Sequence, residues 1–310
     1  MSYNINFPNL GIYWDFVPKS FNIGNFPVAL YGIILALGMV AGLFVALGLA
    51  KASGQKKDIY YDLAIWGIIV SIICARIYYV AFSWDQYKDN LLDIFNIRQG
   101  GIAIYGAVIG AIGTAVVLCK IKKASFWVIV DTAISGLITG QIVGRWGNFV
   151  NREVFGEYTD NVFAMQLPLN AVREQDISPL IRENIVNVGG IDYIQVHPTF
   201  LYESVLNLVV LGIMIFFFFH KSYKGQILLI YITGYGYVRA FVEGIRTDQL
   251  MIPNSSIPVS QLVGFICAGV GTVLLIVFGI RSAIKKKQQK IAEAIVEAGG
   301  DGMSINKKTE

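Results

Sequence analysis

The chain has 310 residues, of which 55% are hydrophobic and 15% are charged. Ordinary soluble domains carry about 25% charged residues, so this composition excludes a soluble globular protein. The formal net charge of +4 is mild, and we expect no nucleic-acid partner. The excess of apolar residues must instead face the acyl chains of a lipid bilayer.

Long apolar segments recur along the whole chain. A bilayer core of about 30 Å requires roughly 20 apolar residues per helix. Seven segments satisfy this requirement, at about 26–50, 60–83, 100–119, 127–150, 198–220, 225–245 and 258–280. The sequence therefore predicts an all-α integral membrane protein with seven transmembrane helices. Glycines inside the segments, such as Gly106, Gly110 and Gly113, favour close approach between helices.

The first 25 residues lack the basic region and the cleavage site of a removable signal peptide. Aromatic side chains at Trp14, Phe16, Phe21 and Phe26 indicate that this segment lies on the outer membrane interface. The three cysteines, Cys74, Cys119 and Cys267, fall inside or at the end of predicted spans without metal-ligand spacing. We expect reduced packing residues and no metal site.

The distribution of Lys and Arg predicts the orientation of the chain. Basic residues cluster after the first, third, fifth and seventh segments, whereas the opposite loops carry few close to the helix ends. The clusters are Lys51, Lys56 and Lys57; Lys120, Lys122 and Lys123; Lys221 and Lys224; and Arg281, Lys285, Lys286, Lys287 and Lys290. The positive-inside rule then places the N-terminus outside and the C-terminus in the cytoplasm.

We expect residues 1–281 to form one seven-helix catalytic domain. Its outside loop at 151–197 is too long for a simple connection, which predicts a small extracytoplasmic cap or a substrate arm. Residues 282–310 should form a basic cytoplasmic tail, which is helix-favouring at 291–298 and then partly disordered. Its basic part is suited to the anionic inner leaflet.

Three arginines share one predicted depth in the membrane. Arg76, Arg145 and Arg239 each lie about five to seven residues before the outer end of a span, roughly 7–11 Å below the boundary. An intramembrane arginine normally faces a cavity and has a partner. Snorkelling to headgroups is the simpler alternative. Arg239 also has Glu243 four residues away as a structural partner, and Arg76 is the one best explained by packing.

Further polar groups reach the same outer level from other spans. They are Tyr31, Tyr105, Glu243 and the run HPTFLYE at 197–203. A guanidinium forms bidentate hydrogen bonds with phosphate, and the abundant phosphates of the outer leaflet belong to phospholipids. This position predicts a cavity that holds a lipid headgroup.

The densest motif is the end of the fourth segment, where residues 144–156 read GRWGNFVNREVFG. This motif resembles the signature of the prolipoprotein diacylglyceryl transferases, a family of bacterial membrane enzymes. Further matching pieces are PVALYG at 27–32, ARIYYV at 75–80, GGIAIYG at 100–106, HPT at 197–199, LYE at 201–203 and RAFVEGIR at 239–246. The resemblance extends over nearly all seven spans.

The resemblance implies that the diacylglyceryl group of phosphatidylglycerol is transferred to the lipobox cysteine of a prolipoprotein in the bacterial cell membrane. A thioether forms and glycerol 1-phosphate leaves, and no cofactor is expected. The resemblance assigns Arg145 to the lipid headgroup and Arg239 to the catalytic centre. The other expected site residues are Tyr31, Arg76, Tyr105, Asn148, Glu153, Gly156 and Glu243.

Tyr105 departs from the family pattern, because many members have His at this position. A phenol is a poor base at neutral pH, so either Tyr105 only orients the lipid, or the arginines lower the pKa of the substrate thiol directly. For His197 we expect helix packing or a hydrogen bond within its turn. In the expected reaction a thiolate attacks the glyceryl carbon, and Arg145 and Arg239 stabilise charge on the departing phosphate.

The main alternative is a transporter or flippase for phospholipids, which would also contain buried charge. A transport path requires polar groups near the midplane and toward both faces. Here the polar groups gather on one side, which favours the transferase.

Overall fold

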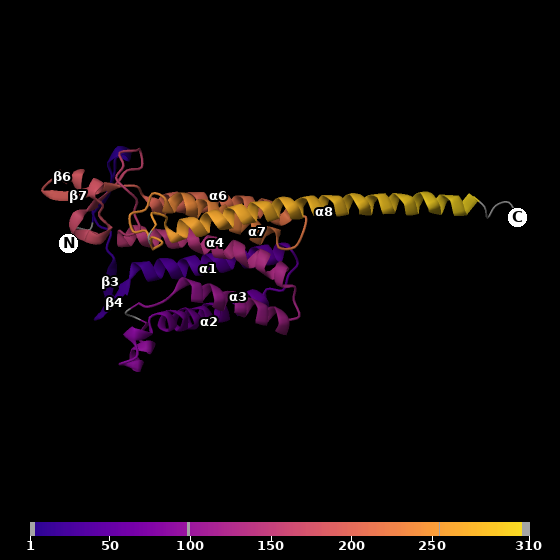
Figure 1. Cartoon of the computed structure of the whole chain (residues 1–310), viewed down its shortest axis with the longest axis horizontal. Coiled ribbons are helices and arrows are strands. Elements are labelled where there is room, and N and C mark those ends of the chain that lie inside the picture. Colours follow the sequence, from indigo (N-terminus) through magenta and orange to yellow (C-terminus); the bar gives the residue numbers. More distant parts are fainter. Residues whose placement is uncertain (1–3, 98–99, 254, 306–310) are drawn as a thin grey trace.

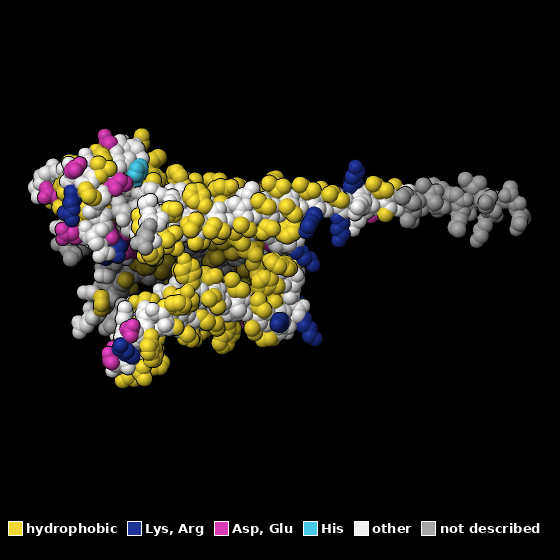
Figure 2. Space-filling view, in the orientation of Figure 1, with side chains coloured by type: hydrophobic (Ala, Val, Ile, Leu, Met, Phe, Trp, Pro, Cys, Tyr) yellow, Lys and Arg dark blue, Asp and Glu magenta, His cyan; other side chains and the backbone are white. Residues whose placement is uncertain are grey.

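The computed structural model describes residues 4–97, 100–253 and 255–305 as a bundle of long helices with a small β region at one end (Figure 1). The long helices are α1 (Leu30–Ala52), α2 (Asp58–Phe82), α3 (Ile104–Ile121), α4 (Phe126–Asn151), α6 (Thr199–His220), α7 (Gln226–Glu243) and α8 (Val259–Ile305). Large apolar side chains cover the outer flanks of the bundle (Figure 2), as expected for contact with lipid.

Six of these helices are long and apolar enough to cross a membrane within the described residues, namely α1, α2, α3, α4, α6 and α8. The protein is therefore a mostly helical, multi-pass membrane protein. Helix α7 has 18 residues but carries Arg239 and Glu243 near its end, and it is not among the six. A seventh crossing thus stays a prediction.

The expectation of an all-α protein is wrong, because the chain also contains two small sheets. One has five antiparallel strands in the order β2-β1-β5-β7-β6: β1 (Ile5–Phe7), β2 (Ile12–Trp14), β5 (Met165–Pro168), β6 (Val186–Val188) and β7 (Ile191–Val196). The other is a hairpin of β3 (Ser20–Ile23) and β4 (Phe26–Ala29). The first span consequently begins at Leu30 and not near 26, since Pro27 favours extended backbone at Phe26.

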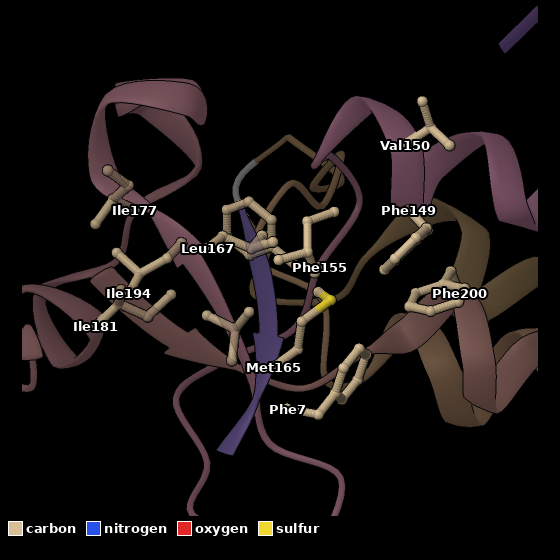
Figure 3. Close-up of a cluster of buried hydrophobic side chains, with 12 residues drawn as sticks. Phe7, Phe149, Val150, Phe155, Met165, Leu167, Ile177, Ile181, Ile194 and Phe200 are labelled. Atoms are coloured by element: carbon tan, nitrogen blue, oxygen red, sulfur yellow. The ribbon is translucent and has the colours of Figure 1, made fainter. Parts of the chain in front are cut away.

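Segment 151–197 folds together with the N-terminus. Strand β5 pairs with both β1 and β7, and the short helix α5 (Pro179–Glu183) covers their apolar side. The core beneath contains Ile5, Phe7, Met165, Leu167, Ile181 and Ile194 (Figure 3). It continues into the ends of α4 and α6, where the rings of Phe149 and Phe200 lie 4.9 Å apart. The β region therefore fixes the helix ends that carry the polar motif.

The expected tail continues α8 as one helix as far as Ile305, well beyond the bundle (Figure 1). The helix-favouring part at 291–298 lies within it. Residues 306–310, at the end of the segment predicted to be partly disordered, lie outside the described residues.

Glycines bring α1 and α4 into direct backbone contact. A Cβ atom at Gly42 would lie 2.3 Å from the carbonyl oxygen of Gly136, and one at Gly136 would lie 2.5 Å from that of Gly42. Gly106 and Gly110 play the same part between α3 and α2, whereas Gly113 has nothing within 4 Å of its Cβ position. Small residues therefore allow close approach in both helix pairs, as membrane packing favours.

Substitution of Gly42 by Ala should destabilise the protein, because the new methyl group must push α1 away from α4. Overpacking of this kind costs roughly 1–3 kcal/mol. The thermal midpoint in detergent should fall for Gly42→Ala and should not fall for Gly48→Ala, a control in the same helix with open space at its Cβ position. Equal midpoints for the two variants would show that the contact is not limiting.

Asp131 in α4 is a buried polar residue that the sequence analysis did not single out. Its carboxylate accepts hydrogen bonds from the backbone N–H groups of Gly225, Ile227 and Leu228 at 2.9–3.1 Å, and Lys221 lies 3.5 Å away. A carboxylate at a helix N-terminus accepts hydrogen bonds from the free N–H groups of the first turn. Its negative charge also interacts favourably with the positive end of the helix dipole. Asp131 thus ties the start of α7 to α4.

Candidate active site

A buried carboxylate on α6 joins arginines from two other helices. Arg145 Nη2 of α4 lies 2.7 Å from Glu203 Oε1, and Arg239 Nη1 of α7 lies 3.9 Å from Glu203 Oε2. The Glu203 side chain is 1% exposed, whereas the two arginine side chains are about one-fifth exposed. The three helices therefore create a charged centre in which the carboxylate is buried and the two arginine side chains are partly exposed.

Tyrosines complete the surroundings of Arg145. The Tyr235 hydroxyl lies near the Arg145 guanidinium, and Tyr235 precedes Arg239 by one helical turn. The Tyr31 ring of α1 lies against Gly147, where a Cβ atom would come within 2.3 Å of the ring. Gly147 is therefore the residue that lets Tyr31 reach this centre.

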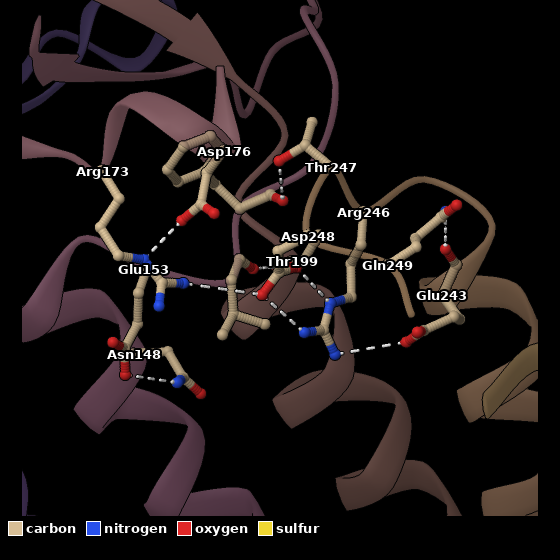
Figure 4. A network of polar contacts seen from close by, with 12 residues as sticks. Asn148, Glu153, Arg173, Asp176, Thr199, Glu243, Arg246, Thr247, Asp248 and Gln249 are labelled. Carbon is tan, nitrogen blue, oxygen red and sulfur yellow. Dashed lines mark hydrogen bonds and ion pairs between the residues drawn. The ribbon is translucent and has the colours of Figure 1, made fainter. Parts of the chain in front are cut away.

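A second carboxylate continues the ion-pair network toward the loop after α7. Glu243 Oε2 lies 2.7 Å from Arg239 Nη2 and 3.3 Å from Arg246 Nη1. Arg246 also binds Asp248 through two hydrogen bonds of 3.0 and 2.9 Å (Figure 4). Asp248 in turn lies 4.0 Å from Arg173 of the β region. The network thus connects the loop after α7 with the β region.

The motif at the end of α4 forms a compact polar turn. The side-chain amide of Asn148 donates to Glu153 Oε1 at 3.2 Å (Figure 4). The side-chain amide of Asn151 donates to the same oxygen at 3.3 Å. Arg152 and Val154, on either side of Glu153, have positive φ angles of 56° and 58°, which are uncommon for residues other than glycine. In this backbone conformation the Glu153 carboxylate lies beside the two side-chain amides.

Gly156 lies where three segments of the chain cross. Its N–H donates to the carbonyl of His197, and it forms a bridge with Arg246. A Cβ atom here would lie 2.8 Å from both the His197 side chain and the Ile245 carbonyl oxygen. Glycine is required at this position because the motif, the start of α6 and the loop after α7 approach so closely.

Two predicted site residues are not brought to this centre. Arg76 donates to the carbonyls of Asp93, Ile94, Gly100 and Gly101 at 2.6–2.9 Å, so its guanidinium holds the loop between α2 and α3. Tyr105 at the start of α3 is half exposed, and its nearest aromatic neighbour is Tyr78 of α2. Helices α2 and α3 form one edge of the bundle, with α1 between them and α4 (Figure 1).

His197 contacts the first turn of α6, as its sequence position suggested, and also the β region. Its Nδ1 lies 3.2 Å from the Tyr202 hydroxyl and 3.4 Å from the Asn161 side-chain nitrogen. Burial lowers the pKa of the imidazole, and Glu157 opposes this only in part. The neutral ring at pH 7 therefore serves as a hydrogen-bonding group of the turn.

Glu203 and Tyr235 were absent from the residues predicted for the site. Glu203 belongs to the run at 197–203. An acidic residue at the predicted depth of the arginines is the sequence feature that indicates a partner for them. Tyr235 lies four residues before Arg239, a spacing that places both on one helix face. The spacing alone does not show which face meets Arg145.

The two guanidinium groups suit a phosphate whose negative charge increases during a reaction. Arg239 Nη1 is buried without a hydrogen-bond partner in the described part of the chain, which leaves a donor for such a ligand. Fold and site together define a multi-pass membrane protein with a charged centre of two arginines and a buried carboxylate at one end of its helices.

Comparisons with known proteins identify the family. The family model of prolipoprotein diacylglyceryl transferase matches residues 18–277. Proteins named phosphatidylglycerol–prolipoprotein diacylglyceryl transferase are similar to the chain: that of Acaryochloris marina is 40% identical over 268 residues (84% of this chain, 92% of the relative). That of Listeria innocua is 44% identical over 234 residues (76% and 80%), and that of Bacillus velezensis is 37% identical over 259 residues (84% and 91%).

The chain belongs to the prolipoprotein diacylglyceryl transferase family, and the resemblance inferred from its motifs is confirmed. It is a membrane transferase of lipoprotein biosynthesis.

Proposed function

We propose that the chain transfers the diacylglyceryl group of phosphatidylglycerol to the lipobox cysteine thiol of prolipoproteins at the Arg145–Glu203–Arg239 centre. A thioether forms and glycerol 1-phosphate is released. The observation that carries this assignment is the buried Glu203 carboxylate, which holds guanidinium groups from two helices at 2.7 and 3.9 Å. The names of the relatives supply the two substrates.

The enzyme acts in the bacterial cell membrane with its N-terminus outside and its C-terminus in the cytoplasm, with α7 as the seventh span. Lys and Arg side chains gather where α8 leaves the helix bundle (Figure 2). This end of the bundle is therefore expected on the cytoplasmic side, which supports the orientation. The β region and the arginine centre lie toward the other end. The site therefore opens to the outer leaflet, where the prolipoprotein cysteine is exposed.

The substrate thiolate attacks the glyceryl carbon that carries the phosphate ester. The new C–S bond forms as the C–O bond breaks, and the electron pair stays with the phosphate of glycerol 1-phosphate. Arg145 binds the headgroup phosphate, and Arg239 Nη1 donates to the oxygen on which charge increases. The positions of these groups are held by Asn148, Glu153, Gly156, Tyr31 and Glu243. The arginines lower the pKa of the substrate thiol, which releases its proton to water before the attack.

Two predicted residues support the lipid from outside this centre. Tyr105, half exposed at the start of α3, orients the bound lipid and does not act as the base. Arg76 contributes to lipid binding indirectly, through the loop that its guanidinium holds beside α3.

The assignment is tested with purified protein, labelled phosphatidylglycerol and a lipobox peptide. Thioether product and released glycerol phosphate are expected with the cysteine peptide, and neither is expected with a Cys→Ser peptide. A folded sample that binds the lipid but yields no product would contradict the transferase and favour the transport alternative.

Tyr105→Phe should keep kcat within about threefold of wild type and raise KM for the lipid, because the hydroxyl contributes to binding but not to the chemical step. Steady-state kinetics with varied phosphatidylglycerol measure both constants. A fall in kcat of roughly a hundredfold or more would instead identify the hydroxyl as a participant in proton transfer.

A further inference from the structure

A ligand-sized groove lies between α6, α7 and α8, at the end of the bundle opposite the arginine centre. Its volume is about 420 Å³, within the range of small-molecule binding pockets. The walls are apolar and consist mainly of Ile213, Phe217, Ile230, Gly234, Leu275 and Gly279. On α7 the lining extends from Gln226 to Gly234, roughly 12 Å at 1.5 Å per residue. This shape suits one extended hydrocarbon chain.

The groove has one polar end, formed where α8 crosses the connection between α6 and α7. The Ser282 hydroxyl donates to the Ser222 carbonyl at 3.0 Å, and Lys286 Nζ lies 3.4 Å from the Ser222 hydroxyl. Gly279, Ser282 and Lys286 follow each other at spacings of three and four residues, so they share one face of α8. Along this face of α8, the apolar lining of the groove is followed directly by the ammonium group of Lys286.

The positive charge at this end has no compensating carboxylate in the described side chains. No Asp or Glu among them lies within 4 Å of Lys224, Arg281, Lys285 or Lys286. Lys221 is the exception, because it pairs with Asp131. Figure 2 shows Lys and Arg side chains gathered where α8 leaves the bundle. An anion is therefore the complementary ligand.

The hydroxyl oxygens of the lining residues Thr233 and Tyr223 are buried and therefore do not face the groove. The groove thus offers a ligand an apolar wall and one positively charged end. An acyl chain joined to an anionic phosphate matches both features and occurs in one class of molecule.

We propose that this groove binds an anionic phospholipid, with one acyl chain between α6, α7 and α8 and its phosphate beside Lys286 and Ser222. The site is separate from the arginine centre and binds lipid without reacting with it. In the orientation of the proposed function, the ligand comes from the inner leaflet. Binding itself does not depend on the transferase activity.

The test is native mass spectrometry of delipidated protein titrated with phosphatidic acid or with phosphatidylcholine of the same acyl chains. Gly279→Leu fills the groove without a clash, because its Cβ position has nothing within 4 Å. Gly269→Leu is the matched control, since it lies on the same helix, has the same open space and is outside the lining. Lys286→Ala removes the cation.

Wild type and Gly269→Leu should retain one more phosphatidic acid molecule than Gly279→Leu. Lys286→Ala should bind it about fivefold more weakly, the effect of one lysine near an anionic lipid. Equal retention by Gly279→Leu and Gly269→Leu, or equal affinity of wild type for the two lipids, would overturn the proposal. Transfer activity of the same samples is recorded separately, so its absence in wild type would count against the proposed function alone.

Discussion

Arg239→Lys is expected to lower kcat for diacylglyceryl transfer by about 10²- to 10³-fold, the usual effect of losing one donor to a developing anion. Arg239 uses Nη2 for Glu243 at 2.7 Å, while Nη1 lies 3.9 Å from Glu203 and lacks a hydrogen-bond partner among the described residues. A lysine ammonium keeps the positive charge but is a single point of contact. It can pair with Glu243 or reach the phosphate, but it cannot reproduce both contacts in the same geometry.

The measurement is the transfer assay under saturating lipid and peptide, with Arg182→Lys as the control. Arg182 forms an exposed ion pair with Glu174 at 3.2 Å, and its replacement should leave kcat unchanged. Full activity of Arg239→Lys would show that the planar, two-armed guanidinium is dispensable. The role of Arg239 in phosphate stabilisation would then have to be abandoned.

Glu203→Gln is expected to cause the largest loss of stability. Glu203 is the carboxylate that pairs with Arg145, at 2.7 Å, and it is almost fully buried. Removal of one partner of a buried ion pair costs roughly 3–5 kcal/mol, because the other charge stays buried without compensation. For a chain of this size we expect the thermal midpoint in detergent to fall by on the order of 10 °C. Transfer activity should fall as well, since both guanidinium groups shift.

The matched control is Glu174→Gln, which removes the carboxylate of an exposed ion pair. The Glu174 side chain is 85% exposed, so screening by water leaves this pair with little influence on stability. A midpoint for Glu203→Gln within about 2 °C of the control would contradict the organising role of Glu203. The centre would then be held together by helix packing alone.

Helix positions could be predicted from the sequence because the bilayer sets a minimum length for each apolar run. The predicted segments at 60–83, 127–150 and 198–220 correspond to α2, α4 and α6, with ends that differ by two residues or fewer. The strands could not be predicted in this way. They are three to six residues long, and β1 pairs with β5 at Asn6 and Gln166, a partner about 160 residues away.

The sequence by itself determined the family, through the motif at 144–156 and its companions, and it placed the charged residues near one end of their helices. The position of a residue along its helix gives only its place along the helix axis. It does not show where in the plane of the membrane that helix lies relative to the others. Arg76, Arg145 and Arg239 share a predicted depth, yet Arg76 holds a loop on the α2–α3 edge while the other two meet at Glu203. Which helices lie side by side is decided by contacts such as that between Gly42 and Gly136, which exist only in the folded protein.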